Sequence, residues 1–476
     1  MQPTDHGLKR ELKLRDLVLM QVLLIVGLNL SSYAAKQGPS QVVLWLLAMA
    51  LFYLPQAGVV IALSRAIPLE GGVYQWVKLG ISPFAGFMAG WCFSLYIVCY
   101  FASFGSQVAN GMAYAGGAWM GSSKAFALSI TIAICLMAFV LNVRGLQVTK
   151  WLSGAGSVVH ILVFLIMAFL LLKVFAMPGA WAMHREETAH RPSASAALSL
   201  AWPGFSLLTL NVFTKMAMFA LSGFDQCSIF GEECRKPKND VARSVWIAAP
   251  LIALMYIVVT GAILAYIPSA EVDMAAPVSQ AMQAGFGPTG LGRALMAVAL
   301  AGVNFSLAAC VVLVVGMVAR LPMTAGWDGL LPGWWSELHP RFKTPSKAVG
   351  AVAGGLLLMG GLSLFGAGNQ EAVQVLSAVG FGSYCIMYML LFGGVIFGFR
   401  SSEWRPGIGI RLGALAALSV VVVSFVFELI PIGEVKSPVL FAIKVTGAIC
   451  ATTGLGATLY WRGSLRAQRL AAVAES

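Results

Sequence analysis

A carboxylate stands inside an apolar stretch near the middle of the sequence. Residues 219–240 read FALSGFDQCSIFGEECRKPKND, which places Asp225 two residues after Gly223. A charged side chain at the centre of a bilayer costs roughly 2.5–3.5 kcal/mol unless it is paired or hydrated. Two roles fit a carboxylate here: it neutralises the ammonium group of a substrate, or it caps the second half of an interrupted helix. The neighbours expected to line a binding site are Phe219, Ala220, Ser222 and Gly223.

The first apolar stretch is interrupted in a similar way. Residues 17–40 read LVLMQVLLIVGLNLSSYAAKQGPS, so that an apolar run gives way to glycine, asparagine and serine. Unwinding a helix frees N–H and C=O groups that lipid cannot satisfy, and such a break must therefore line a cavity. The free N–H groups suit a carboxylate and the free carbonyls suit an ammonium group, so a zwitterion of amino-acid size would satisfy both. The residues expected to contact it are Val26, Gly27, Leu28, Asn29 and Ser31.

The elements that position these residues must lie in lipid. The chain of 476 residues is 59% hydrophobic and 11% charged, whereas soluble domains carry about 25% charged residues. Since a membrane helix needs about 20 mostly apolar residues, the sequence predicts an all-α polytopic membrane protein with twelve such helices. Their predicted ranges are 17–35, 41–64, 84–113, 124–142, 150–177, 211–233, 243–267, 289–321, 345–365, 371–399, 409–432 and 437–460.

The two interrupted helices, the first and the sixth, each begin a run of five. Interruptions at corresponding positions indicate an inverted-repeat transporter, although each glycine taken alone could serve only close helix packing. The predicted organisation is a five-plus-five inverted repeat with two extra C-terminal helices. Its segments are an N-terminal tail (1–16), a first repeat (17–177), an extracellular loop (178–210), a second repeat (211–399), helices 11 and 12 (400–461) and a C-terminal tail (462–476).

The basic residues predict the orientation. With the N-terminus in the cytoplasm, 22 of the 31 Lys and Arg residues fall on the inner side, as the positive-inside rule requires. We therefore expect an integral protein of the plasma (inner) membrane with both termini cytoplasmic. The net charge of +12 does not indicate nucleic-acid binding, because the basic residues form short clusters between apolar segments.

Four motifs resemble the amino acid–polyamine–organocation (APC) permeases. They are SGFDQCSIFGEECRKPKNDVARS (222–244), PLEGGVYQW (68–76), FAGFMAGW (84–91) and ARLPMTAGWDGLLP (319–332), which are similar to the family's sixth helix, the loop after its second helix, the start of its third and the exit from its eighth. The resemblance implies a LeuT-like fold with broken helices 1 and 6, and alternating-access transport of amino acids or related amines. The family usually carries Gly-Ser-Gly at the first break, where this chain has VGLNLSSY (26–33). The carboxylate site is therefore expected to be narrower, or lined by the side chains of Asn29 and Ser31.

His160 lies mid-way along the fifth predicted helix, in SVVHILVF. Several proton-coupled relatives carry a Lys on this helix, and the resemblance implies that His160 takes its place as the ion-coupling residue. Histidine titrates near pH 6.5, so it would bind carbonyls of helix 1 when charged and release them when neutral. A neutral structural histidine is the alternative. Sodium coupling also stays open, because Asn304 and Ser306 in the eighth helix are possible ligands.

Two further groups have both a functional and a structural interpretation. Glu232 and Glu233 adjoin a basic cluster, and they either form a salt-bridge gate at the inner end of helix 6 or belong to a solvated charge cluster. Tyr100 shares a helix face with Tyr96, and one of the two either closes over the substrate or packs in the core.

These observations favour a secondary active transporter that takes up amino acids with protons. An amino-acid or polyamine exchanger and a non-transporting amino-acid sensor are the alternatives. Glu428 lies near a membrane edge and therefore supplies no second carboxylate for a polyamine. An enzyme is not indicated, since no convergent nucleophile and base is visible, and no cofactor or metal site is expected. The expected partners are a small-molecule substrate, a proton and the lipid bilayer, while the oligomeric state is left open.

Overall fold

The computed structural model describes residues 10–176, 198–274, 276–287, 290–365, 369–399, 404–431 and 437–475. Its described part is built of helices and connecting turns, with one isolated parallel bridge between Leu12 and Cys234. Most of the predicted extracellular loop, 178–197, lies outside the described residues. The prediction of an all-helical polytopic protein is confirmed.

The first half of the bundle begins with an interrupted helix. α1 (Leu14–Ile25) ends before Gly27, and the following segment, Leu28–Ala35, is bent by 42° relative to it. That segment consists of a 3-10 turn, η1 (Leu28–Leu30), and α2 (Ser31–Ala35). The elements that follow are η2 (Gly38–Ser40), α3 (Gln41–Ala48), the π-helical η3 (Met49–Tyr53), α4 (Leu54–Ala66), α5 (Val73–Gly80), α6 (Pro83–Phe101), α7 (Phe104–Gly116), α8 (Trp119–Ser122), α9 (Lys124–Arg144) and α10 (Leu146–Ala176).

The second half begins with the second interrupted helix. α13 (Leu207–Lys215) runs into the π-helical η5 (Met216–Ala220), the chain then leaves helical geometry, and it resumes as the 3-10 helix η6 (Gln226–Phe230). The remaining elements are α14 (Pro237–Tyr266), η7 (Ser269–Glu271), α15 (Pro277–Phe286), α16 (Gly290–Val318), α17 (Arg320–Trp327), η8 (Gly333–Trp335), α18 (Ser346–Phe365), α19 (Asn369–Phe397), α20 (Ile408–Phe427) and α21 (Pro438–Glu475).

The number of spans is ten or eleven by length and composition in the described part of the chain, rather than the predicted twelve. Ten helices are long and apolar enough to cross a membrane, and counting the bent pair α1–α2 as one span gives eleven. The predicted sixth helix corresponds to a shorter apolar helix, Leu207–Ala220. The break shortens that helix below the length of a span, which is why the count of twelve is not confirmed.

The helix starts follow from local sequence. Ser82 and Ser123 precede α6 and α9, and each side-chain oxygen accepts a hydrogen bond from a backbone N–H three residues later, at 3.2 Å. Ser206 does the same for α13, accepting from the N–H of Thr209 at 3.0 Å. These N-caps satisfy donors that a helix start leaves free, and they fix where three apolar helices begin.

The packing has an internal symmetry. The two most extensive helix contacts are α6 with α19 and α10 with α16, which correspond to the third predicted helix with the tenth and the fifth with the eighth. Exchanging the two predicted repeats maps one of these pairs onto the other. The inverted repeat stays a prediction, and this pairing of contacts supports it.

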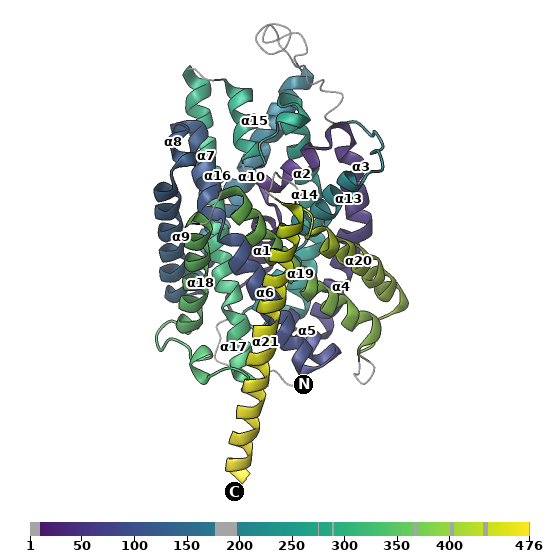
Figure 1. The fold of residues 1–476 in the computed structure, drawn as a ribbon, viewed down its shortest axis with the longest axis vertical. Helices are drawn as coiled ribbons and strands as arrows, with labels where there is room; N and C mark the ends of the chain where they lie inside the picture. The colour runs from purple at the N-terminus through teal and green to yellow at the C-terminus, as the bar shows by residue number, and fades with distance from the viewer. Residues whose placement is uncertain are drawn as a thin grey trace.

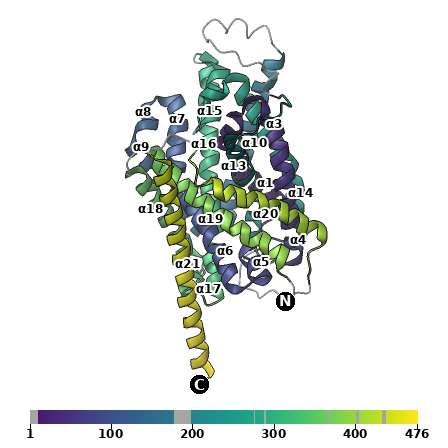
Figure 2. The ribbon, with the colours of Figure 1, turned by 45° about the vertical axis from the view of Figure 1, so that its right-hand side comes forward.

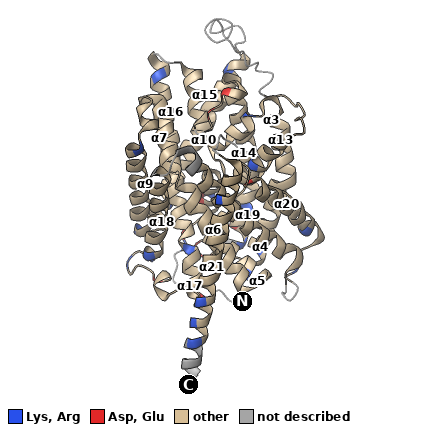
Figure 3. Cartoon of the chain, viewed as in Figure 1, with Lys and Arg blue, Asp and Glu red and all other residues tan. Residues whose placement is uncertain are grey.

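Charge and shape distinguish the two ends of the bundle. α5, α17 and the projecting end of α21 lie at one end, here named the basic end, while α8 and α15 lie at the other, here named the opposite end (Figure 1). α20 and α21 run along the outside of the bundle, and α21 continues past it (Figure 2). Lys and Arg residues occur along the projecting part of α21 and in the loops near it (Figure 3).

Candidate substrate site

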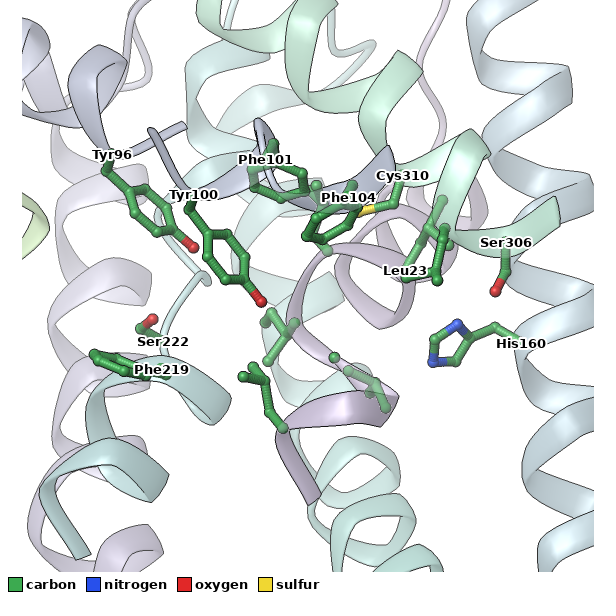
Figure 4. A pocket seen from close by; sticks show the side chains of 16 residues that line it. Leu23, Tyr96, Tyr100, Phe101, Phe104, His160, Phe219, Ser222, Ser306 and Cys310 are labelled. Atoms are coloured by element: carbon green, nitrogen blue, oxygen red, sulfur yellow. The ribbon is translucent and has the colours of Figure 1, made fainter. Parts of the chain in front are cut away.

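The two helix breaks meet at a small cavity. Its walls come from α1 and its break, α6, α7, α10, η5 and α16, with the tyrosine and phenylalanine rings on one side and His160 and Ser306 on the other (Figure 4). Six of the predicted site residues line it: Val26, Gly27, Tyr100, His160, Phe219 and Ser222. The cavity measures about 30 Å³, which is room for about one or two water molecules. It is closed to a ligand of amino-acid size in this conformation.

The break in the first helix is held by a tyrosine from α14. The Gly27 N–H donates to the Tyr256 hydroxyl at 3.0 Å, and that hydroxyl donates to the Ile25 carbonyl at 2.7 Å. Tyr256 is itself buried and stacks on Trp45, with the ring centroids 4.6 Å apart. One side chain therefore satisfies two of the backbone groups that the break frees, as a low-dielectric surrounding demands. Tyr256 could not be identified as a partner from the sequence, because 229 positions separate it from Gly27.

The break in the second helix is held in the same way. The Gly223 N–H donates to the Tyr388 hydroxyl of α19 at 3.2 Å, and this hydroxyl donates to Asp225 at 2.5 Å. Gln56 of α4 also donates to Asp225, at 3.3 Å, and to the Tyr388 hydroxyl. Gly223 has a φ of 127°, a backbone conformation that favours glycine because it has no Cβ.

The Asp225 side chain contacts Tyr388 and Gln56 and does not line the cavity. Its side chain is fully buried, and it makes no capping hydrogen bond to the N-terminus of η6. One carboxylate oxygen, Oδ2, has no hydrogen-bond partner. Capping of the half-helix, one of the two roles considered from the sequence, is therefore not made in this conformation, whereas binding of an ammonium group stays a prediction.

The other predicted contact residues surround the cavity without lining it. Leu28, Ser31 and Ala220 are buried, and the Ser31 hydroxyl has no partner. The Asn29 amide donates to Gln107 of α7 at 3.0 Å and faces a different cavity.

His160 is buried beside the first break. Its side chain is 3% exposed, and neither ring nitrogen makes a hydrogen bond. The backbone of Val26, at the break itself, interacts with the imidazole ring electrostatically. Ser306 lies nearby on α16 (Figure 4). A buried imidazole without partners is costly, so this arrangement leaves both ring nitrogens available for a bond formed in another state.

A larger cavity, here named the vestibule, lies between the small cavity and the opposite end of the bundle. It measures about 990 Å³ and is lined by residues of the opposite end, among them Lys36, Lys124 and Asp273. Leu30, Tyr100 and Phe219 line both cavities. The Phe219 ring stacks on Phe381, with the centroids 3.3 Å apart. Phe219 and Tyr100 thus form an aromatic lid between the vestibule and the small cavity.

A buried charge cluster lies at the basic end. Arg320 donates to both carboxylate oxygens of Glu233, with one of the two distances 2.7 Å, and lies 3.5 Å from Glu70. The other Glu70 oxygen accepts from the Glu232 N–H at 2.8 Å. Burial raises the pKa of the Glu70 carboxyl, and the neighbouring Glu233 raises it further. Of the two predicted gating residues, Glu233 therefore contributes its side chain, and Arg320 and Glu70 complete the cluster.

Two more sets of contacts connect segments at the basic end that are distant in sequence. The chain at Leu12 pairs with the end of the second break, its N–H donating to the Glu233 carbonyl at 3.1 Å. Lys78 contacts Asp328 at 2.6 Å, and Tyr74 donates to the same carboxylate at 2.6 Å. In the described residues, no group of three or more His, Cys, Asp or Glu side chains is placed to hold a metal ion.

Comparison with known proteins agrees with this architecture. A sequence profile described as amino acid permease matches residues 12–449. An uncharacterized transporter of Mycobacterium tuberculosis is 25% identical over 81% of this chain and 80% of its own length. The methylthioribose transporter of Bacillus subtilis is 24% identical over 75% and 76%, and the branched-chain amino acid permease BcaP of the same organism is 24% identical over 72% and 73%. With spans, broken helices and a profile match over most of its length, the chain is an integral membrane protein that belongs to the amino acid permease family.

Proposed function

We propose that this permease is a secondary active transporter of neutral amino acids that works by alternating access. The observation that carries the proposal is the meeting of two broken helices at a cavity with apolar and aromatic walls. Backbone N–H groups of the break in α1 suit a carboxylate once they are released, and the Gly27 N–H, which donates to the Tyr256 hydroxyl in this conformation, is the one proposed to bind it. Rings and aliphatic side chains around them, such as Tyr100, Phe104 and Leu23, suit an uncharged side chain.

The conformation fits the outward-facing side of the transport cycle, with the opposite end facing outside. The vestibule reaches the lid from that end, whereas the Arg320–Glu233–Glu70 cluster closes the basic end. The positive-inside rule supports assigning the basic end and both termini to the cytoplasm. Phe219 and Tyr100 must move for an amino acid to enter, because the cavity beneath them holds only water-sized molecules.

Coupling to protons through His160 is the second part of the proposal. A protonated His160 could donate to the Val26 carbonyl and hold the break in α1, while a neutral one would release it. Exchange of one amino acid for another would need no such titration, so His160 would then be structural. A sensor would bind amino acids without flux.

The test is uptake of a labelled neutral amino-acid pool into proteoliposomes, with an inward proton gradient and no sodium. We expect accumulation that depends on the gradient in the wild type, is lost in His160→Ala and is retained at least in part in His160→Lys, which keeps a protonatable group. Uptake that ignores the gradient but needs amino acid preloaded inside would contradict proton coupling and identify an exchanger. Binding without flux would identify a sensor.

A further inference from the structure

A buried ion pair lies in the wall of the vestibule. Lys215, the last residue of α13, contacts Glu428 just after α20, with Nζ and Oε1 2.5 Å apart. Their side chains are only 5% and 2% exposed, yet both line the vestibule. Glu428 is thus neither at an exposed edge nor unpaired, and it brings a second buried carboxylate close to the substrate path.

The pair stands at the entrance to the small cavity. Lys215 lies one helical turn before Phe219, and its Nζ is 4.7 Å from the centroid of the Phe219 ring. Phe219 is shared by the vestibule and the cavity. A ligand that moves from one to the other by displacing Phe219 therefore passes both charges.

The other charged groups of the vestibule are differently placed. The Lys36 ammonium donates to the Ala270 carbonyl at 2.9 Å, and the Asp273 carboxylate accepts from the Tyr114 hydroxyl. Lys124 is exposed. In the described part of the vestibule wall, only Lys215 and Glu428 form a buried pair of opposite charges.

We propose that Lys215 and Glu428 determine specificity by favouring zwitterions in the vestibule. Separating a buried pair leaves each charge uncompensated, which is strongly unfavourable. A zwitterion can enter between them, its carboxylate on Lys215 and its ammonium group on Glu428, and keep both charges paired. An amine without a carboxylate leaves Lys215 unpaired, and an acid without an ammonium group leaves Glu428 unpaired. The inference rests on the proposed function and extends it, because it selects amino acids over polyamines.

Leucine and its two one-charge analogues provide the test. Isopentylamine is leucine without its carboxylate, and 4-methylpentanoate is leucine without its ammonium group. Displacement of labelled leucine from purified protein is measured for the wild type, Lys215→Met, Glu428→Gln and the double variant. The assay reports binding, so a variant that cannot transport still gives a result.

We expect each single variant to shift selectivity in its own direction. Lys215→Met leaves Glu428 unpaired, so isopentylamine should displace labelled leucine about tenfold better from this variant than from the wild type. Glu428→Gln leaves Lys215 unpaired, so 4-methylpentanoate should gain by about the same factor. The reason is that an uncompensated charge discriminates strongly between ligands. The double variant has no charge to satisfy and should favour neither analogue. Lys347→Met and Glu337→Gln are matched controls, because they remove an exposed ion pair far from the vestibule, and they should keep the wild-type ratios.

Two outcomes separate the inference from the function on which it rests. If the wild type binds leucine and the folded single variants keep its ratio of amine to acid competition, the pair is structural and the inference is wrong. If the wild type binds no neutral amino acid, the proposed function fails and the inference fails with it. Elution as a single peak in size exclusion and a cooperative melting transition establish that the variants are folded.

Discussion

At the scale of single residues, two tyrosine hydroxyls have the same task. Tyr256 and Tyr388 come from different helices, and each accepts a hydrogen bond from the glycine N–H at a helix break. Each then donates onward, Tyr256 to the Ile25 carbonyl and Tyr388 to Asp225. The breaks are therefore positioned by side chains of the protein itself.

Removal of the Tyr256 hydroxyl should loosen the first break. In Tyr256→Phe the Gly27 N–H and the Ile25 carbonyl keep the hydrogen bond between them, at 2.9 Å, but both lose the tyrosine hydroxyl, and each hydrogen bond lost typically costs about 0.5–1.5 kcal/mol. We expect a lower melting temperature and a raised KM for amino-acid uptake. Tyr266→Phe, on the same helix, removes the hydrogen bond to the Leu170 carbonyl, away from the breaks, and should leave KM unchanged. Equal KM values in the two variants would show that Tyr256 has no part in positioning the site.

The sequence could predict which segments break, but not what holds them. Gly27 and Gly223 interrupt apolar runs, a local pattern that is visible in the sequence. Tyr256, Tyr388 and Glu70 are distant in sequence from the groups they bind, and tyrosine or glutamate alone carries no positional signal. Glu428 illustrates the same limit, because its burial depends on Lys215, 213 residues earlier. Asp225 was visible as a residue, whereas its direction, toward Tyr388, depends on tertiary packing.

At the scale of elements, the second break depends on one glycine conformation. Gly223 has a positive φ, and a Cβ there would lie 3.0 Å from Ile25 and 3.1 Å from Gln226. Both strain and crowding therefore oppose any larger residue. The break lies between the π-helical η5 and the 3-10 helix η6. The interrupted helix that begins with α13 therefore changes its winding twice within a few residues.

Gly223→Ala should abolish most transport while the protein still reaches the membrane. An alanine at this φ costs about 1–2 kcal/mol and pushes on the break of α1 through Ile25, so the substrate cavity should be misshapen. Uptake in proteoliposomes, normalised to reconstituted protein, measures the loss. Gly58→Ala is the control, because no atom lies within 4 Å of its added Cβ and alanine favours a helix. Wild-type uptake by Gly223→Ala would contradict the role assigned to this backbone conformation.

At the scale of the whole molecule, the vestibule and the charge cluster at the basic end fit one state of the proposed transport cycle. In that proposal, opening toward the basic end requires Arg320 to release Glu233 and Glu70. Cys234 is fully buried beside this cluster, and burial raises the pKa of its thiol, with Glu70 adding to the effect. A protonated, buried thiol reacts slowly, so Cys234 reports on whether the basic end is open.

Arg320→Met should open the basic end. Loss of the arginine leaves two buried carboxylates without their cation, which is destabilising by several kcal/mol. In a Cys450→Ser background, which removes the exposed thiol, we expect a charged maleimide to label Cys234 at least about tenfold faster, since about 1.4 kcal/mol corresponds to a factor of ten. Lys347→Met removes an exposed pair and should not change the rate. Equal labelling of Arg320→Met and wild type would show that the cluster does not hold the closed state.

The aromatic lid has a consequence for inhibitors. The vestibule has the volume of a pocket for a drug-sized ligand, about 300–1,000 Å³, whereas the space beneath Phe219 has room for water alone. A compound that fills the vestibule and is too large to pass Phe219 would stabilise the conformation to which it binds. A permease molecule with this compound bound would no longer transport substrate. Size at one phenylalanine ring then separates the compounds that this permease carries from those that stop it.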